Sequence, residues 1–110
     1  MAVKNTAMKD YNVSFDKICN ALRCEDFIKC LAADLTEEVI LGDAREFRYV
    51  RKTDIVRYYG RNYFVKVTPK GEDSVNVAVT TQSRKVTVLF DTAWKTEVDK
   101  IFAYIDLLIR

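Results

Sequence analysis

Apolar and polar residues alternate along the middle of the chain, which is the pattern of β-strands half-buried in a sheet. The segments there that are rich in β-branched and aromatic residues are EFRYV (46–50), IVRYY (55–59), YFVKVT (63–68), SVNVAVTT (74–81) and VTVLF (86–90). Between them lie KTD, GRN, PKGED and QSRK, where Gly60, Pro69 and Gly71 supply residues that turns favour. This spacing predicts an antiparallel meander of about five strands.

The alternation divides the side chains between the two faces of the predicted sheet, because successive residues of a strand point to opposite sides. The predicted core face is strongly apolar and holds Phe47, Tyr49, Tyr63, Val65, Val67, Val75, Val77, Val79, Val86, Val88 and Phe90. The opposite side, which we term the open face, is polar and basic with scattered apolar residues. It holds Arg48, Val50, Lys52, Phe64, Lys66, Thr68, Asn76, Ala78, Thr80, Thr87 and Leu89.

Two amphipathic helices are predicted at the ends of the chain. Ser14 can cap the first, whose apolar stripe is Phe15, Ile18, Cys19 and Leu22. Asp91 or Thr92 can cap the second, whose stripe is Trp94, Val98, Ile101, Phe102, Ile105 and Leu108. Both stripes need an apolar surface to cover. The sequence therefore predicts an α+β fold, a two-layer sandwich with both helices packed on one face of the sheet.

The segment DFIKCLAADL (26–35) fits two structures. The apolar stripe of the first helix ends at Leu22, so either a second helix begins near Glu25 or the segment is extended. We expect a strand, although the local propensity of its Ala-Ala-Asp-Leu part favours a helix.

The composition predicts one domain over residues 1–110. Its 18 cations and 16 anions leave a net charge of +2, so any basic surface must be local. The start, MAVKNTAMKDYNVSF, lacks the apolar core of a signal peptide. No apolar run approaches the roughly 18 residues of a membrane span. We therefore expect a cytoplasmic protein that makes no membrane contact.

Catalytic and metal-binding signatures are sparse. Cys19, Cys24 and Cys30 form no C-x-x-C pair and the chain has no histidine, which predicts reduced, buried or half-buried free thiols, with a redox or weak metal role as the alternative. There is no G-x-S-x-G, Gly-rich phosphate loop or H-E-x-x-H. We expect no enzyme and no cofactor, and interpret the acidic pairs 37–38 and 72–73 as solvated charges in turns.

The stretch REFRYVRKTDIVRYYGRNYFVKV (45–67) is rich in cations and aromatics. One interpretation of the open face is a solvated sheet surface on which Arg and Lys stems cover apolar atoms, and functional hypotheses are the alternatives. The first hypothesis is a protein-interaction module, able to form a homodimer, that uses Arg48, Val50, Lys52, Phe64, Lys66 and Leu89. The second is a weak nucleic-acid binder that uses Arg48, Lys52, Arg57, Arg61 and Lys66. The second is less favoured, because GRNYFVKV matches the RNA-binding pattern of base-stacking sheets only at Phe64 and Val65.

A third hypothesis is a small-ligand pocket. It would lie between the C-terminal helix and the sheet, near Trp94 and Tyr104, or at the turn predicted for TTQSRK (80–85). The hydroxyls and basic groups of that turn could hold an anion. A core position for Trp94 and a plain hairpin at 80–85 are the alternatives.

Four stretches, GDAREFRYV, RYYGRNYFVKVT, VAVTTQS and FDTAW, together span residues 42–94. They resemble a family of short, uncharacterised bacterial proteins, mostly from Firmicutes, known only as a domain of unknown function. The resemblance implies an α+β fold with an N-terminal helix, a meander and a C-terminal helix, and it implies no activity or ligand. A Gly-Gly pair typical of that family in the turn at TTQSRK is absent from this chain.

Overall fold

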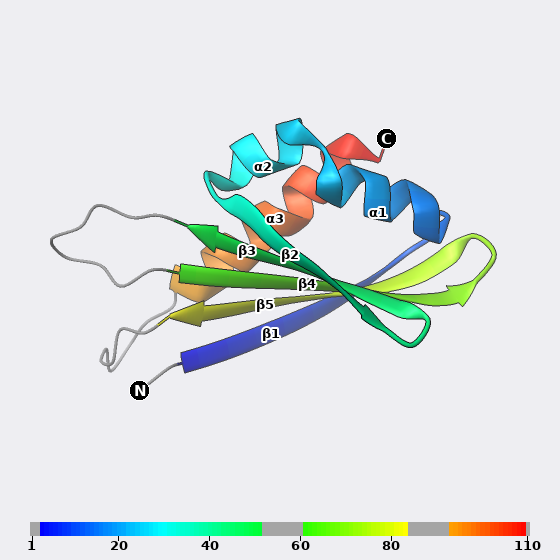
Figure 1. The fold of residues 1–110 in the computed structure, drawn as a ribbon, viewed down its shortest axis with the longest axis horizontal. Coiled ribbons are helices and arrows are strands. Elements are labelled where there is room, and N and C mark those ends of the chain that lie inside the picture. The colour runs from blue at the N-terminus through cyan, green and yellow to red at the C-terminus, as the bar shows by residue number, and fades with distance from the viewer. Residues whose placement is uncertain (1–2, 52–60, 84–92, 110) are drawn as a thin grey trace, which may run out of the picture.

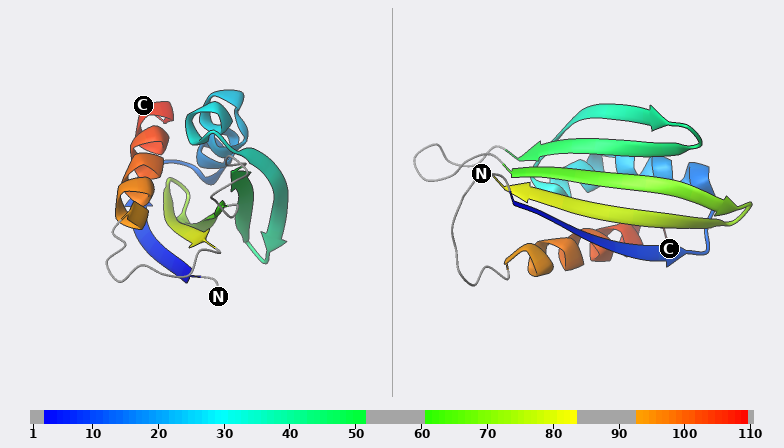
Figure 2. Two further views of the ribbon diagram at one scale, coloured as in Figure 1. Left: turned by 90° about the vertical axis from the view of Figure 1, so that its left-hand side faces the viewer. Right: turned by 90° about the horizontal axis from the view of Figure 1, so that it is seen from below.

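The computed structural model describes residues 3–51, 61–83 and 93–109, which form one antiparallel sheet and three helices (Figure 1). The elements in chain order are β1 Val3–Tyr11, α1 Phe15–Arg23, α2 Glu25–Leu31, β2 Asp34–Leu41, β3 Ala44–Arg51, β4 Arg61–Gly71, β5 Ser74–Ser83 and α3 Ala93–Leu108. All three helices lie on the same side of the sheet (Figure 2). This confirms the predicted α+β sandwich of a sheet covered by helices on one face.

The strand order is β1-β5-β4-β3-β2, so β2 to β5 form a meander and β1 pairs with β5 at the far edge. Three predicted strand segments lie within β3, β4 and β5, whereas 55–59 and 86–90 lie outside the described residues. The sequence did not predict β1 or β2. KNTAMKDY is poor in strand-forming residues, and β1 is stabilised by pairing with β5 and by an ion pair of 3.0 Å from Lys9 to Asp106 of α3.

The predicted core face is confirmed wherever the structure describes it. Fully or nearly fully buried there are Phe47, Tyr49, Tyr63, Val65, Val67, Val75, Val77 and Val79. The remaining predicted members, Val86, Val88 and Phe90, lie outside the described residues. The strand register is therefore the one that the alternation predicted.

Helix α1 forms as the sequence predicted. The Ser14 hydroxyl accepts a hydrogen bond of 3.2 Å from the Lys17 backbone N–H, and the apolar side of the helix is buried. The buried Tyr49 hydroxyl donates 2.6 Å to the carbonyl of Leu22 in the last turn. At Cys24 the backbone becomes extended, which separates α1 from α2.

Helix α2 corrects the expectation that 26–35 is a strand, because residues 25–31 are helical and only the last two belong to β2. Phe27 and Leu31 are four residues apart, so a single helical turn buries both. The Phe27 ring meets Tyr49 edge-on at 5.6 Å between centroids. The helix ends at Ala32 in the left-handed conformation with φ of 53°, and the chain then enters β2.

Helix α3 buries Val98, Ile101 and Ile105 against the sheet, with Phe102 and Leu108 partly buried, in agreement with the predicted stripe. The predicted caps, Asp91 and Thr92, lie outside the described residues, as does the Trp94 side chain. In the part of the chain that the structure describes, every helix is too short or too polar to traverse a lipid bilayer.

Several predicted turns are wholly or partly strand. β4 continues through Gly71, so PKGED contributes only Glu72 and Asp73 to the β4–β5 turn. Residues 80–83 of TTQSRK belong to β5, because the pairing of β1 extends to Ser83, and 84–85 lie outside the described residues. An anion-binding turn at 80–83 is therefore wrong. Glu37 and Glu38, also expected in a turn, lie in β2.

Candidate functional site

The open face carries four of its six predicted interaction residues as expected. Arg48 lies opposite Phe64 across the β3–β4 pair, Val50 lies opposite Asn62, and Lys66 lies opposite Ala78 of β5. Lys52 and Leu89 lie outside the described residues. The sheet therefore brings Arg48 and Phe64 into contact. Lys66 lies two residues beyond Phe64 on β4, on the same face.

The charge of Arg48 on the open face is neutralised within the molecule. Arg48 forms ion pairs with Glu46 at 2.8 Å and with Glu37 at 3.0 Å, and these carboxylates raise the pKa of its guanidinium, Glu46 most strongly. The Phe64 ring lies below two cations, at 5.9 Å from Lys4 Nζ and 5.8 Å from Arg48 Cζ. A guanidinium whose charge is compensated by two carboxylates attracts a phosphate only weakly.

Arg45, another cation of the basic stretch, does not reach the open face. Its guanidinium lies 3.4 Å from Glu38 Oε1 and over the Phe15 ring of α1 at 5.9 Å. Glu38 also accepts a hydrogen bond of 3.0 Å from Arg23 Nε at the end of α1. Glu37 and Glu38 are both exposed, as the solvated-charge interpretation predicted, and each carboxylate also forms an ion pair with an arginine.

The three cysteines are free thiols in different environments. Cys19 is buried, and burial raises its pKa to about 11. Cys24 is half-buried, whereas Cys30 is exposed, so the predicted burial is wrong for Cys30. Within the described ranges, no group of three or more possible metal ligands occurs.

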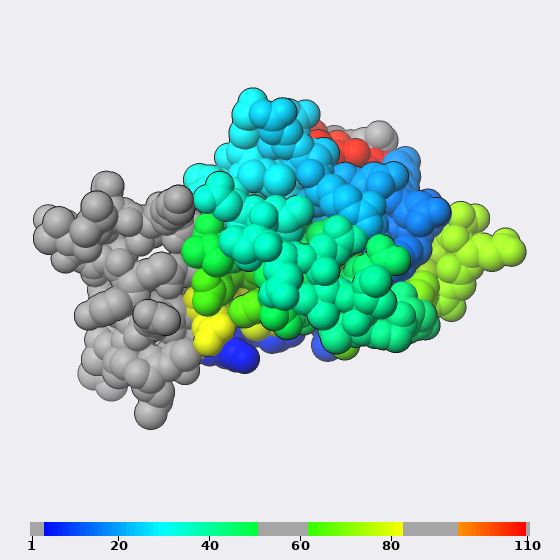
Figure 3. Space-filling view, in the orientation of Figure 1, coloured from blue at the N-terminus to red at the C-terminus, as the bar shows by residue number. Residues whose placement is uncertain are grey.

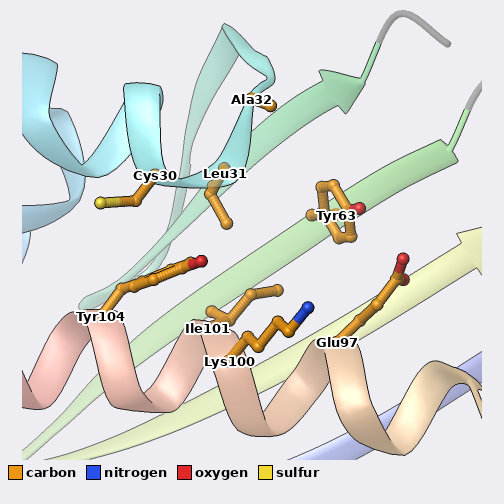
Figure 4. A pocket seen from close by; sticks show the side chains of 8 residues that line it. All are labelled: Cys30, Leu31, Ala32, Tyr63, Glu97, Lys100, Ile101 and Tyr104. Carbon is orange, nitrogen blue, oxygen red and sulfur yellow. The ribbon is translucent and has the colours of Figure 1, made fainter.

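A cleft of about 130 Å³, partly open to solvent, lies between α2, α3 and β4 (Figure 4). We name it the α2–α3 cleft. It is lined by Cys30, Leu31, Ala32, Tyr63, Glu97, Lys100, Ile101 and Tyr104. It lies between the C-terminal helix and the sheet, which is the location that the small-ligand hypothesis predicted.

Local structure explains why these side chains converge. Four lining residues share one side of α3, because three of them follow the first by three, four and seven positions. They are Glu97, Lys100, Ile101 and Tyr104. The left-handed turn at Ala32 ends α2 at the rim of the cleft. The floor is apolar where Ile101 is buried, and one carboxylate oxygen of Glu97 is also buried.

Sequence reasoning identified only part of this cleft. Tyr104 was predicted to lie beside a pocket and does, whereas Glu97, Lys100 and Cys30 were not considered as site residues. Polar residues at helical spacing along the edge of an apolar stripe were the available signal on α3. Nothing local in the sequence indicates that the end of α2 faces them.

No protein-family model and no curated protein sequence matches the chain. Solved structures similar to it include a Staphylococcus aureus protein of unknown function, with a TM-score of 0.58 and 11% identity over 99% of this chain and 94% of that one. A conserved Geobacillus kaustophilus protein has a TM-score of 0.55 and 12% identity, covering 97% and 95%. Truncated norcoclaurine synthase from Thalictrum flavum has a TM-score of 0.54 and 13% identity, covering 99% and 94%.

At these identities the similarity shows a shared fold. The Staphylococcus and Geobacillus proteins are consistent with the resemblance to uncharacterised Firmicutes proteins. The fold is thus found both in proteins of unknown function and in a plant synthase.

Proposed function

We propose that this protein binds a small ligand in the α2–α3 cleft. The carrying observation is the composition of the cleft, where Lys100, Glu97 and Tyr104 surround an apolar floor made by Leu31 and Ile101. Small-molecule sites combine apolar surface with a few converging polar groups, and in this cleft the polar part of the lining is the larger. The volume of about 130 Å³ restricts the enclosed part of the ligand to about one ring, since an apolar cavity of about 150 Å³ holds benzene.

The shared fold supports this proposal. Norcoclaurine synthase from Thalictrum flavum has been solved in complex with dopamine and hydroxybenzaldehyde, both small single-ring compounds. A sheet with helices on one face can therefore accommodate ligands of the size that the α2–α3 cleft allows. The identity of the ligand does not transfer to this chain at 13% sequence identity.

The proposal is for binding without catalysis. The chain has no histidine to act as an acid or base near neutral pH, and so the exposed Cys30 has no histidine to activate it.

The free thiols fit a reducing compartment, which supports an intracellular role in the cytoplasm.

Amide chemical-shift mapping tests this function. Titrating ¹⁵N-labelled protein with a set of single-ring compounds should shift the amides of 30–32, 63, 97, 100, 101 and 104, because these residues line the cleft. The amides of Thr6, Arg48 and Thr80 around Phe64 serve as the internal control, since they lie on the open face. Shifts confined to those control residues, or no shift with any compound, would refute the proposal.

The open face supports a second candidate, a homodimer of this chain. The observation behind it is the partly exposed Phe64 in a shallow depression lined by Lys4, Arg48 and Thr80. Internal neutralisation of Arg48 favours a protein surface over nucleic acid as the occupant. Light scattering at tens of micromolar should show a dimer that Phe64→Glu dissociates; a monomer unaffected by that substitution contradicts this candidate.

A further inference from the structure

Lys100 differs from most cations of the described helices and sheet because it has no anionic partner among the described residues. Arg23, Arg48 and Lys9 all contact carboxylates. No ion pair or hydrogen bond within the described part of the chain involves the Lys100 ammonium. Figure 4 shows this ammonium on the cleft side of α3, between the Tyr104 and Glu97 side chains and below Tyr63. A lysine that extends over a concavity presents its charge to whatever enters it.

Tyr104 adds a second donor beside this charge. It follows Lys100 by four residues, so the two side chains are neighbours on α3. Figure 4 shows its hydroxyl on the same side of the helix, facing α2. An ammonium and a phenol O–H both donate hydrogen bonds, and a carboxylate offers two acceptor oxygens that can bind both.

The other side chains of the cleft determine the rest of the ligand. Leu31 is 6% exposed and Ile101 is 2% exposed, so they form an apolar surface that favours a ring or a compact aliphatic group. Glu97 lies about one turn before Lys100 on α3. Along the helix, Lys100 therefore lies between Tyr104 and Glu97 (Figure 4).

We infer that the α2–α3 cleft binds a small organic carboxylate with one compact ring. The carboxylate contacts Lys100 and Tyr104, and the ring packs on Leu31 and Ile101. This inference rests on the proposed function, because it concerns the same cleft, and it adds the charge of the ligand.

Calorimetric titrations with benzoate and with benzyl alcohol test the inference, because these probes share a ring and differ in charge. Benzoate should bind the native protein about tenfold more tightly than benzyl alcohol, the gain typical of one charge-assisted hydrogen bond. Lys100→Gln should abolish this preference by weakening benzoate binding about tenfold. Lys17→Gln is the matched control, since Lys17 is an exposed lysine of α1 outside the cleft, and should leave both affinities unchanged.

The outcomes separate this inference from the proposed function. Equal affinity of the native protein for benzoate and benzyl alcohol overturns the carboxylate preference and retains a ligand cleft. A benzoate preference that survives Lys100→Gln overturns the role of Lys100. If neither probe binds and no single-ring compound shifts the cleft amides, the proposed function fails together with the inference. A several-fold weaker benzoate affinity in Tyr104→Phe supports the second donor.

Discussion

At the scale of single residues, positions on the core face and on the open face of the sheet have opposite environments. Val77 is fully buried, so Val77→Asp would bury an unpaired charge and should cost several kcal/mol of the roughly 5–15 kcal/mol that stabilise a domain. Lys66→Gln, an exposed change on the open face, should be nearly silent. Urea unfolding of both variants measures the difference, and equal losses would contradict the strand register.

Asn76 requires a different prediction than its outward position alone suggests. The alternation favours a nearly silent Asn76→Asp, but its Nδ2 donates 2.9 Å to Asp10 Oδ1 on β1. This hydrogen bond lowers the pKa of Asp10, and the hydrogen bond from Lys70 lowers it further with a smaller effect. Asn76→Asp replaces the donor with a like charge across the strands, so we expect a measurable loss of stability that is smaller than for Val77→Asp and decreases with added salt. A salt-independent loss would contradict this explanation.

Ala32 is strained, and a glycine should relieve the strain. Its φ of 53° costs a residue with a Cβ about 1 kcal/mol, and glycine would avoid this cost. Glycine also gains freedom in the unfolded state, which offsets part of that benefit. Ala32→Gly should therefore raise the free energy of unfolding by up to about 1 kcal/mol. Ala21→Gly, within α1, is the matched control and should lower it by about 1 kcal/mol. Denaturant midpoints that move in the same direction for both would refute this account.

At the scale of elements, Glu38 joins α1 to the β2–β3 hairpin. Its carboxylate contacts Arg23 of α1 and Arg45 of β3, and Figure 3 shows the helix and hairpin surfaces side by side. The hydrogen bond from Arg23 is the main reason that the pKa of Glu38 lies below its ordinary value of 4.5. Because both groups are partly exposed, the contact is worth about 0.5–1 kcal/mol.

The pH dependence of this contact follows from the sign of the pKa shift. A lowered folded-state pKa means that the stabilisation is complete above the ordinary value of 4.5 and is lost as the pH falls through the folded-state pKa. Glu38→Gln should be less stable than the native protein at pH 7, and the difference should vanish in strong acid. Urea unfolding across pH measures it, with Glu72→Gln in the β4–β5 turn as the control; a pH-independent difference would refute the contact.

The elements predictable from sequence are those whose side chains carry a long periodic pattern. The stripe of α3 and the alternation of β3 to β5 are of this kind. In contrast, α2 has only seven residues and depends on packing of Phe27 against Tyr49, a contact between distant parts of the chain. β1 depends on its pairing with β5 in the same way. Local propensity could not reveal either.

At the scale of the whole molecule, the candidate site depends on the tertiary fold. Leu31, Tyr63 and Tyr104 meet in the cleft from positions distributed over most of the chain. The sequence indicated a pocket between the C-terminal helix and the sheet because Tyr104 lies near the end of an amphipathic helix. It could not indicate the contribution of α2, because that segment was expected to be a strand. The open face was easier to identify, since one strand period defines it.

Intermolecular nuclear Overhauser effects between benzoate and the protein test the central claim most directly. The account predicts contacts from the benzoate ring protons to the methyl groups of Leu31 and Ile101 and to the Tyr104 ring, because these groups line the α2–α3 cleft. The exposed Met8 methyl and the Phe64 ring on the open face should show no contact. Contacts to Met8 and Phe64, with none to Leu31 or Ile101, would contradict a ligand site between α2 and α3.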